Sequence, residues 1–133
     1  MAYHRRNHAK YLNLTHLVMV CKYRKRLLVP FGAIVKDMMR EIAARYGIGI
    51  VEIEVDKDHI HLLIDSKPTM SLLEIVRLFK QISTYRLWRM ENVKRRLVKC
   101  FWKEHTFWSD GYFACSIGNA NPATIQRYIL NQG

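Results

Sequence analysis

The alternation between residues 51 and 66 is the feature that most constrains the fold of this chain. Val51, Ile53 and Val55 alternate with acidic residues, and a second alternating run, from His59 to Ser66, follows a short charged turn. Successive side chains of a strand point to opposite faces, so each run predicts a strand with one apolar face. Two such strands joined by a short turn predict an antiparallel hairpin with one buried face.

Helical patterns stand on both sides of this hairpin. Pro30 begins an amphipathic pattern that Gly47 ends, and Ser71 with Glu74 forms a capping box in front of a second pattern. The other predicted elements are strands at 11–21 and 112–117, a short basic helix after a turn near Asn92, a turn at 118–121, and a last helix from Ala123 to Asn131.

The order of these elements predicts an α+β fold. It reads strand, helix, strand, strand, helix, short helix, strand and helix, which matches the split βαβ arrangement of a ferredoxin-like antiparallel sheet with helices on one face, followed by a C-terminal helix that carries Tyr128. With 133 residues, half of them hydrophobic, residues 1–133 form one domain and leave little room for a second.

The charge balance predicts a polyanionic partner. Lys and Arg number 22 against 11 acidic residues, a formal charge of +11, and nucleic acid fits this balance best. A solvated basic surface or a ribosome-associated protein is the alternative. Ten residues are candidates for a DNA surface by charge alone: Arg5, Arg6, Lys22, Arg24, Lys25, Arg26, Arg77, Lys80, Arg86 and Arg95.

The cysteines and the hydropathy pattern indicate a cytoplasmic protein. Cys21, Cys100 and Cys115 are odd in number, lie far apart and form no C-x-x-C pair, which argues against a disulfide framework and a zinc site. No apolar run approaches the length of a membrane span, and no signal peptide is recognisable, so we expect no membrane partner.

His59 and His61 are the candidate metal ligands. Two imidazoles at i and i+2 of a strand share one face and can converge on one ion. Asp58, Asp65 and Gln132 are candidates for an oxygen ligand, and a mixed nitrogen and oxygen site suits Mg²⁺ or Mn²⁺ beside phosphate oxygens. The alternative is a pair of partly exposed aromatic side chains without a metal.

Tyr128 is the candidate nucleophile. It lies four residues before Gln132, so the two share a face of the last helix if that helix persists to its end. A tyrosine oxygen can attack a phosphodiester and conserve the bond energy in a phosphotyrosine. The alternative is that Ile125, Tyr128 and Ile129 form one apolar stripe that anchors the helix to the core.

Together these motifs resemble the HUH-superfamily single-tyrosine transposases of bacterial and archaeal insertion sequences. The likeness covers nearly the whole chain, and the segments that carry it are 21–28, 58–64, 79–83, 107–113 and 126–132. The position one turn before Tyr128 is Thr124, which is typical of the one-tyrosine class.

The resemblance implies a metal-dependent enzyme that cleaves and rejoins single-stranded DNA at the ends of an insertion sequence. It implies that His59, His61 and Gln132 bind Mg²⁺ or Mn²⁺ and that Tyr128 forms a 5′-phosphotyrosine without ATP. It also implies a homodimer that binds hairpins at the element ends. Two alternatives stay open: a domesticated relative that processes genomic hairpins, and a noncatalytic single-stranded nucleic-acid-binding module, which would need neither the histidines nor Tyr128.

Overall fold

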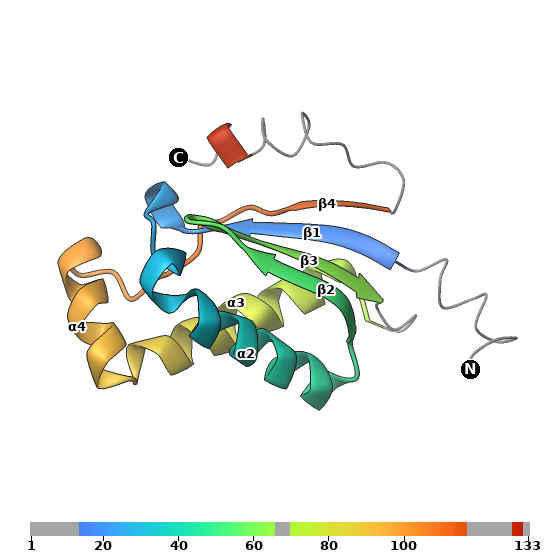
Figure 1. The fold of residues 1–133 in the computed structure, drawn as a ribbon, viewed down its shortest axis with the longest axis horizontal. Coiled ribbons are helices and arrows are strands. Elements are labelled where there is room, and N and C mark those ends of the chain that lie inside the picture. The colour runs from blue at the N-terminus through green and yellow to red at the C-terminus, as the bar shows by residue number, and fades with distance from the viewer. Residues whose placement is uncertain (1–13, 66–69, 117–128, 132–133) are drawn as a thin grey trace, which may run out of the picture.

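The computed structural model describes residues 14–65, 70–116 and 129–131. Figure 1 shows a sheet with helices on one side and the short helical turn at 129–131 on the other. The elements are β1 (Leu14–Val20), the 3-10 helix η1 (Lys22–Arg24), α2 (Leu28–Tyr46), β2 (Gly49–Val55), β3 (His59–Asp65), α3 (Leu72–Trp88), α4 (Glu91–Cys100) and β4 (Phe113–Ser116).

The four strands form one antiparallel sheet in the order β2-β3-β1-β4. Strand β1 pairs with β3 along its length, so that Val18 lies opposite His61 and Val20 opposite His59. Strands β2 and β3 form the predicted hairpin, and β4 pairs with the other side of β1. Because β3 separates the two strands that α2 connects, the sheet is compatible with the split βαβ arrangement. The predicted α+β class is confirmed.

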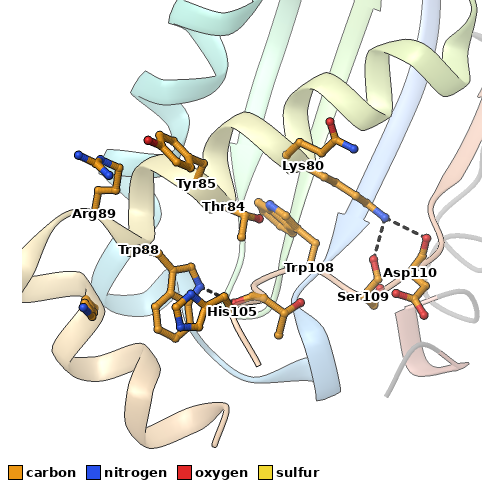
Figure 2. A pocket seen from close by; sticks show the side chains of 12 residues that line it. Lys80, Thr84, Tyr85, Trp88, Arg89, His105, Trp108, Ser109 and Asp110 are labelled. Carbon is orange, nitrogen blue, oxygen red and sulfur yellow. Dashed lines mark hydrogen bonds between the residues drawn. The ribbon is translucent and has the colours of Figure 1, made fainter. Parts of the chain in front are cut away.

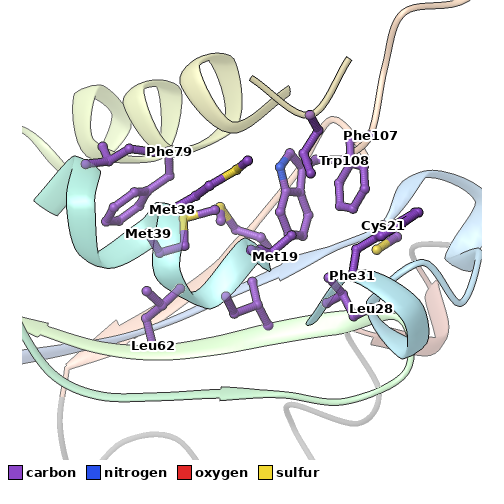
Figure 3. Packing of buried hydrophobic residues seen from close by; sticks show 14 of the residues in the cluster. Met19, Cys21, Leu28, Phe31, Met38, Met39, Leu62, Phe79, Phe107 and Trp108 are labelled. Atoms are coloured by element: carbon purple, nitrogen blue, oxygen red, sulfur yellow. The ribbon is translucent and has the colours of Figure 1, made fainter. Parts of the chain in front are cut away.

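The alternation of β1 and β3 divides the sheet into two unlike faces. Met19 and Leu62 point toward the helices, where they join Met38, Met39 and other apolar side chains in the main core (Figure 3). Val18 and Val20 point the other way and form a separate small cluster with Ile129. The main core therefore lies between the sheet and α2 with α3, and the opposite face remains for a site.

Helix α2 begins at Leu28, before the predicted start at Pro30. The N–H groups in the first turn of a helix have no acceptor within the helix. Proline, which lacks an N–H, can therefore stand in this turn without loss of a hydrogen bond, and Pro30 is the third residue of α2. The predicted end is confirmed: Gly47 adopts the left-handed conformation, with φ of 71°, and its N–H caps the helix on Ala43 and Ala44.

The start of α3 is confirmed, and the predicted turn and short basic helix follow its end. The Ser71 hydroxyl accepts from the Glu74 N–H at 3.1 Å, and the Glu74 carboxylate accepts from the Ser71 N–H at 2.8 Å, which is the predicted capping box. The turn lies at Arg89 and Met90, two residues before Asn92. Leu87 and Val93, on either side of this turn, are both buried in the main core.

Strand β2 departs from the simple alternation at Val51. The register shifts between Ile50 and Glu52, which leaves Val51 as the extra residue of a bulge and 57% exposed. Val51 is therefore not part of the apolar face that the sequence pattern predicts.

The C-terminal elements are described only in part. The predicted turn at 118–121 and the last helix before Ile129 lie outside the described residues, and residues 129–131 are helical. None of the described helices is both long and apolar enough to cross a membrane.

Candidate functional site

His59 and His61 lie on β3, on the face of the sheet away from the helices. Their neighbours Ile60 and Leu62 are fully buried in the main core, whereas both histidines are partly exposed. Strand β3 is hydrogen bonded on both sides, to β1 and β2, so the backbone between the two imidazoles is held in place. The structure therefore presents both rings on one open face, as the alternation predicts.

Asp58 contacts the ring of His59. One carboxylate oxygen lies 3.0 Å from Nδ1 of the imidazole, and the Asp58 carbonyl accepts from the Cys21 N–H at 2.8 Å. The aspartate is thus anchored to the end of β1 and orients the His59 ring. A carboxylate on one ring nitrogen increases the basicity of the other, which is the usual arrangement behind a metal-binding histidine. Asp58 is accordingly placed to orient a ligand.

His16 is a third imidazole at this site, and the sequence prediction missed it. Its Nδ1 lies 2.9 Å from Nε2 of His61, and the two rings stack with centroids 5.1 Å apart and planes inclined by 15°. His16 precedes Val18 and Val20 at two-residue spacing, so its face could be predicted from the alternation. Its contact with His61 depends on the register of β1 against β3, which the sequence pattern does not specify.

The surroundings of His61 favour its neutral form. Burial lowers the pKa of the imidazole, and the adjacent His16 lowers it further, while Glu54 and Glu52 on β2 act in the opposite direction. A neutral imidazole keeps a lone pair on one nitrogen, which is the form that binds a metal. The predicted ligand is therefore in the required protonation state near neutral pH.

The two histidines fit a divalent cation as part of a larger ligand set. Within residues 14–65, 70–116 and 129–131, no group of three or more His, Cys, Asp or Glu side chains is arranged to hold a metal ion. Asp65 stands four residues beyond His61, about 13 Å along the strand, so the structure does not bring this predicted oxygen candidate to the imidazoles. A cation here would need further ligand atoms from other parts of the chain or from a bound phosphate.

Ile129, in the described turn at 129–131, packs on the histidine face. Tyr128 and Gln132 lie outside the described residues, but the turn at 129–131 is described between them. Ile129 is 4% exposed and packs with Val18 and Val20, the residues that pair with His61 and His59. Figure 1 shows this turn on the side of the sheet opposite α2 and α3.

Three of the predicted DNA-contact residues have intramolecular partners. The Lys80 ammonium donates to the carbonyl oxygens of Ser109, Asp110 and Gly111 at 2.7, 3.1 and 2.8 Å. Burial lowers its pKa, Asp110 raises it, and Lys22 lowers it. Lys22 lies 3.7 Å from the Asp110 carboxylate, and Arg86 lies 2.7 Å from Glu41.

The other candidates are distributed over the surface. Arg24, Arg26, Arg77 and Arg95 are exposed and Lys25 is partly exposed, while Arg5 and Arg6 lie outside the described residues. Arg24 and its neighbour Tyr23 have positive φ, of 51° and 58°, in the tight turn after β1. Exposed basic side chains on α4 and η1 thus remain available for a polyanion.

The sequence profile of the family described as "Transposase IS200 like" matches residues 9–132. The chain belongs to this family of transposases. The ISDra2 transposase TnpA of Deinococcus radiodurans is 32% identical over 119 residues, which cover 88% of this chain and 81% of that protein. The transposase for insertion sequence element IS200 of Salmonella typhimurium is 30% identical over 132 residues, covering 97% and 80%. The resemblance that the motifs predict is confirmed.

Two solved structures share the fold of this chain. The crystal structure of a Deinococcus radiodurans R1 protein assigned as a transposase superimposes with a TM-score of 0.78 at 30% identity, covering 90% of this chain and 89% of that one. A REP-associated tyrosine transposase bound to a REP hairpin gives a TM-score of 0.51 at 10% identity, covering 89% and 62%, and shares the fold.

Proposed function

We propose that this IS200-like family member cleaves and rejoins single-stranded DNA at the ends of an insertion sequence through a 5′-phosphotyrosine. Family membership supports transposase activity. The observation that carries the finer proposal is the contact of Ile129 with Val18 and Val20, because it places the residue that follows Tyr128 in the sequence on the face that presents His59 and His61.

Tyr128 is the proposed nucleophile. Its phenolic oxygen attacks the scissile phosphorus and loses its proton, a new O–P bond forms, and the bond from phosphorus to the 3′-oxygen breaks. The departing 3′-oxygen takes up a proton and becomes a free hydroxyl. A second DNA 3′-hydroxyl can reverse the step, so rejoining conserves the bond energy and uses no ATP.

His59, His61 and Gln132 would hold the divalent cation, Mg²⁺ or Mn²⁺. Such an ion supplies positive charge that polarises the phosphoryl group and helps to align it. The described residues support this assignment in two ways: Asp58 orients the His59 ring, and the environment of His61 favours the neutral imidazole. Gln132 lies one residue beyond the described turn, and its part in the site is proposed from the family resemblance.

We propose DNA hairpins at the element ends as the substrate and a homodimer as the active form. The formal charge of +11 and the exposed basic side chains of α4 suit a polyanion. One relative by fold is described as bound to a REP hairpin, which suggests the probe to use.

The test is formation of a covalent adduct. Purified protein is incubated with Mn²⁺ and a labelled single-stranded hairpin taken from the flanks of its own gene, and products are separated under denaturing conditions. The expected result is a protein-linked label that mass spectrometry places on Tyr128 and that a chelator abolishes. Tyr128→Phe should form no adduct while binding the hairpin nearly as tightly as the wild type.

Two further variants separate this proposal from the alternatives. The double substitution His59→Ala with His61→Ala should remove cleavage, whereas a noncatalytic binding module would be unaffected. Tyr46→Phe on α2 is the matched control for loss of a hydroxyl outside the site and should keep full adduct formation. Undiminished adduct in Tyr128→Phe would refute the nucleophile assignment, and hairpin binding without any adduct would favour the binding module.

A further inference from the structure

His16 lies on the histidine face, and the proposed cleavage gives it no role. It stands two residues before Val18 on β1, and Val18 pairs with His61, so His16 and His61 are diagonal neighbours on one face of the sheet. His16 is partly buried, and it pairs with Leu63 of β3 on one side and with Cys115 of β4 on the other. Strands on both sides therefore hold the backbone that carries the His16 ring.

The contact between the His16 and His61 rings joins two nitrogen atoms. Nδ1 of His16 and Nε2 of His61 are 2.9 Å apart, which is a hydrogen-bond distance. This distance makes up most of the 5.1 Å between the ring centroids, and the planes are inclined by only 15°, so the two nitrogens point toward each other. A neutral imidazole carries one N–H and one lone pair, so one ring donates and the other accepts.

Either direction of this hydrogen bond occupies Nε2 of His61. If His16 donates, the hydrogen bond uses the lone pair of that nitrogen. If His61 donates, its Nε2 carries the proton and has no lone pair to offer. Ligation of a metal needs a free lone pair on the nitrogen, so His16 has to release Nε2 of His61 before that atom can bind a cation.

His59 is already prepared for a cation. Its Nδ1 lies 3.0 Å from the Asp58 carboxylate, which leaves Nε2, the nitrogen farther from the backbone, as the ligand atom. The Cα atoms of His59 and His61 are about 7 Å apart along the strand, so the outer nitrogens of the two rings are the atoms best able to converge on one ion. The nitrogen that His61 needs for this purpose is the one that His16 contacts.

We propose that His16 is a positioning residue that competes with the divalent cation for Nε2 of His61. Its hydrogen bond keeps the His61 ring in one orientation, and a change of rotamer of the His16 side chain releases the ring without movement of β1. The contact therefore lowers the affinity of the imidazole pair for a cation. The inference rests on the proposed function, because it takes His59 and His61 as ligands.

The experiment measures the affinity of the full chain for Mn²⁺ from the electron paramagnetic resonance signal of the free ion, at about pH 8, where imidazoles are neutral. His16→Phe keeps a ring but has no nitrogen, and it should bind Mn²⁺ about 3- to 10-fold more tightly than the wild type, the equivalent of one hydrogen bond. His16→Asn places an amide group where Nδ1 stands and should bind Mn²⁺ as the wild type does.

His105→Phe is the matched control for loss of an imidazole outside the site. His105 is exposed and stacks on Trp88 in the helical layer, with ring centroids 4.3 Å apart, so this change should leave the affinity for Mn²⁺ unaltered (Figure 2). A second readout needs no metal. In the chelated protein, the ¹⁵N chemical shift of Nε2 of His61 should change in His16→Phe and should stay close to the wild-type value in His105→Phe.

Failure of this inference and failure of the proposed function give different results. If His61→Ala loses Mn²⁺ binding while His16→Phe binds Mn²⁺ no more tightly than the wild type, the competition is refuted and the cation assignment stands. Weaker binding in His16→Phe would show that His16 supports the ligand, and it would also overturn the proposal. If His61→Ala binds Mn²⁺ as tightly as the wild type, His61 is not a ligand, and the cation assignment and this inference fail together.

Discussion

Replacement of Lys80 by methionine tests whether the three hydrogen bonds of its ammonium stabilise the fold. The Lys80 ammonium points from α3 to three successive carbonyl oxygens, those of residues 109, 110 and 111. Methionine has similar length and packs well against apolar surface, but it offers no donor. Lys80→Met therefore removes the three hydrogen bonds while it keeps most of the volume of the side chain.

The expected loss of stability in Lys80→Met depends on how far each carbonyl oxygen is shielded from water. The contacts to Ser109 and Gly111 are partly buried, and the contact to Asp110 is exposed, so water can replace the last one. A hydrogen bond from a charged donor contributes about 1.5–3 kcal/mol, and half-burial of the ammonium reduces this. Two effective contacts give a loss of about 2–4 kcal/mol, or roughly 7–14 °C in Tm for a chain of this length.

The assay is thermal unfolding followed by circular dichroism. Lys99→Met, at an exposed position of α4, is the matched control and should change stability by less than about 0.5 kcal/mol. Lys80→Arg should recover only part of the loss, because a planar guanidinium cannot direct its donors to three carbonyls as an ammonium does. A Tm for Lys80→Met within about 2 °C of the wild type would show that the ammonium does not hold this segment.

Three further predictions concern the cap of α3 and the imidazole pair. Ser71→Ala should lower the free energy of unfolding in urea by about 1 kcal/mol, because it removes one half of the capping box, and Ser71→Asp should keep most of the wild-type stability. Equal stability of all three proteins would contradict the cap. With chelator present, the free energy of unfolding should fall as pH drops below about 6.5, because the pKa of His61 is lowered in the fold and the unfolded chain binds the proton more readily. His61→Gln should weaken this pH dependence, and an unchanged pH profile in that variant would count against the assignment to His61. His16→Ala should raise the pKa of His61 in an NMR titration, because the neighbouring His16 lowers that pKa, and an unchanged or lower value would count against this effect.

Much of the fold could be predicted because local patterns and tertiary packing agree. The alternation in β3 sends Ile60 and Leu62 into the core and leaves the two histidines on the open face. The capping box at Ser71 and the left-handed Gly47 are local features whose chemistry is complete within one turn of chain. The local sequence is therefore enough to predict these features correctly.

The features that sequence reasoning missed depend on contacts between distant residues. The bulge at Val51 follows from the register of β2 against β3, and the stacking of His16 on His61 joins residues 45 positions apart. Charge alone places Lys80 among the candidate DNA contacts, and it does not show that three carbonyls meet at the Lys80 ammonium. Composition and periodicity carry no information on these pairings.

The contacts of Lys80 also connect the two layers of the protein. The segment that its ammonium holds continues through Tyr112 into β4, where Phe113 packs against the small cluster of Val18, Val20 and Ile129. A side chain in the helical layer thus contributes to the placement of the residue that follows Tyr128 in the sequence. Substitution of Lys80 in the helical layer is consequently expected to alter the geometry of the histidine face on the other side of the sheet.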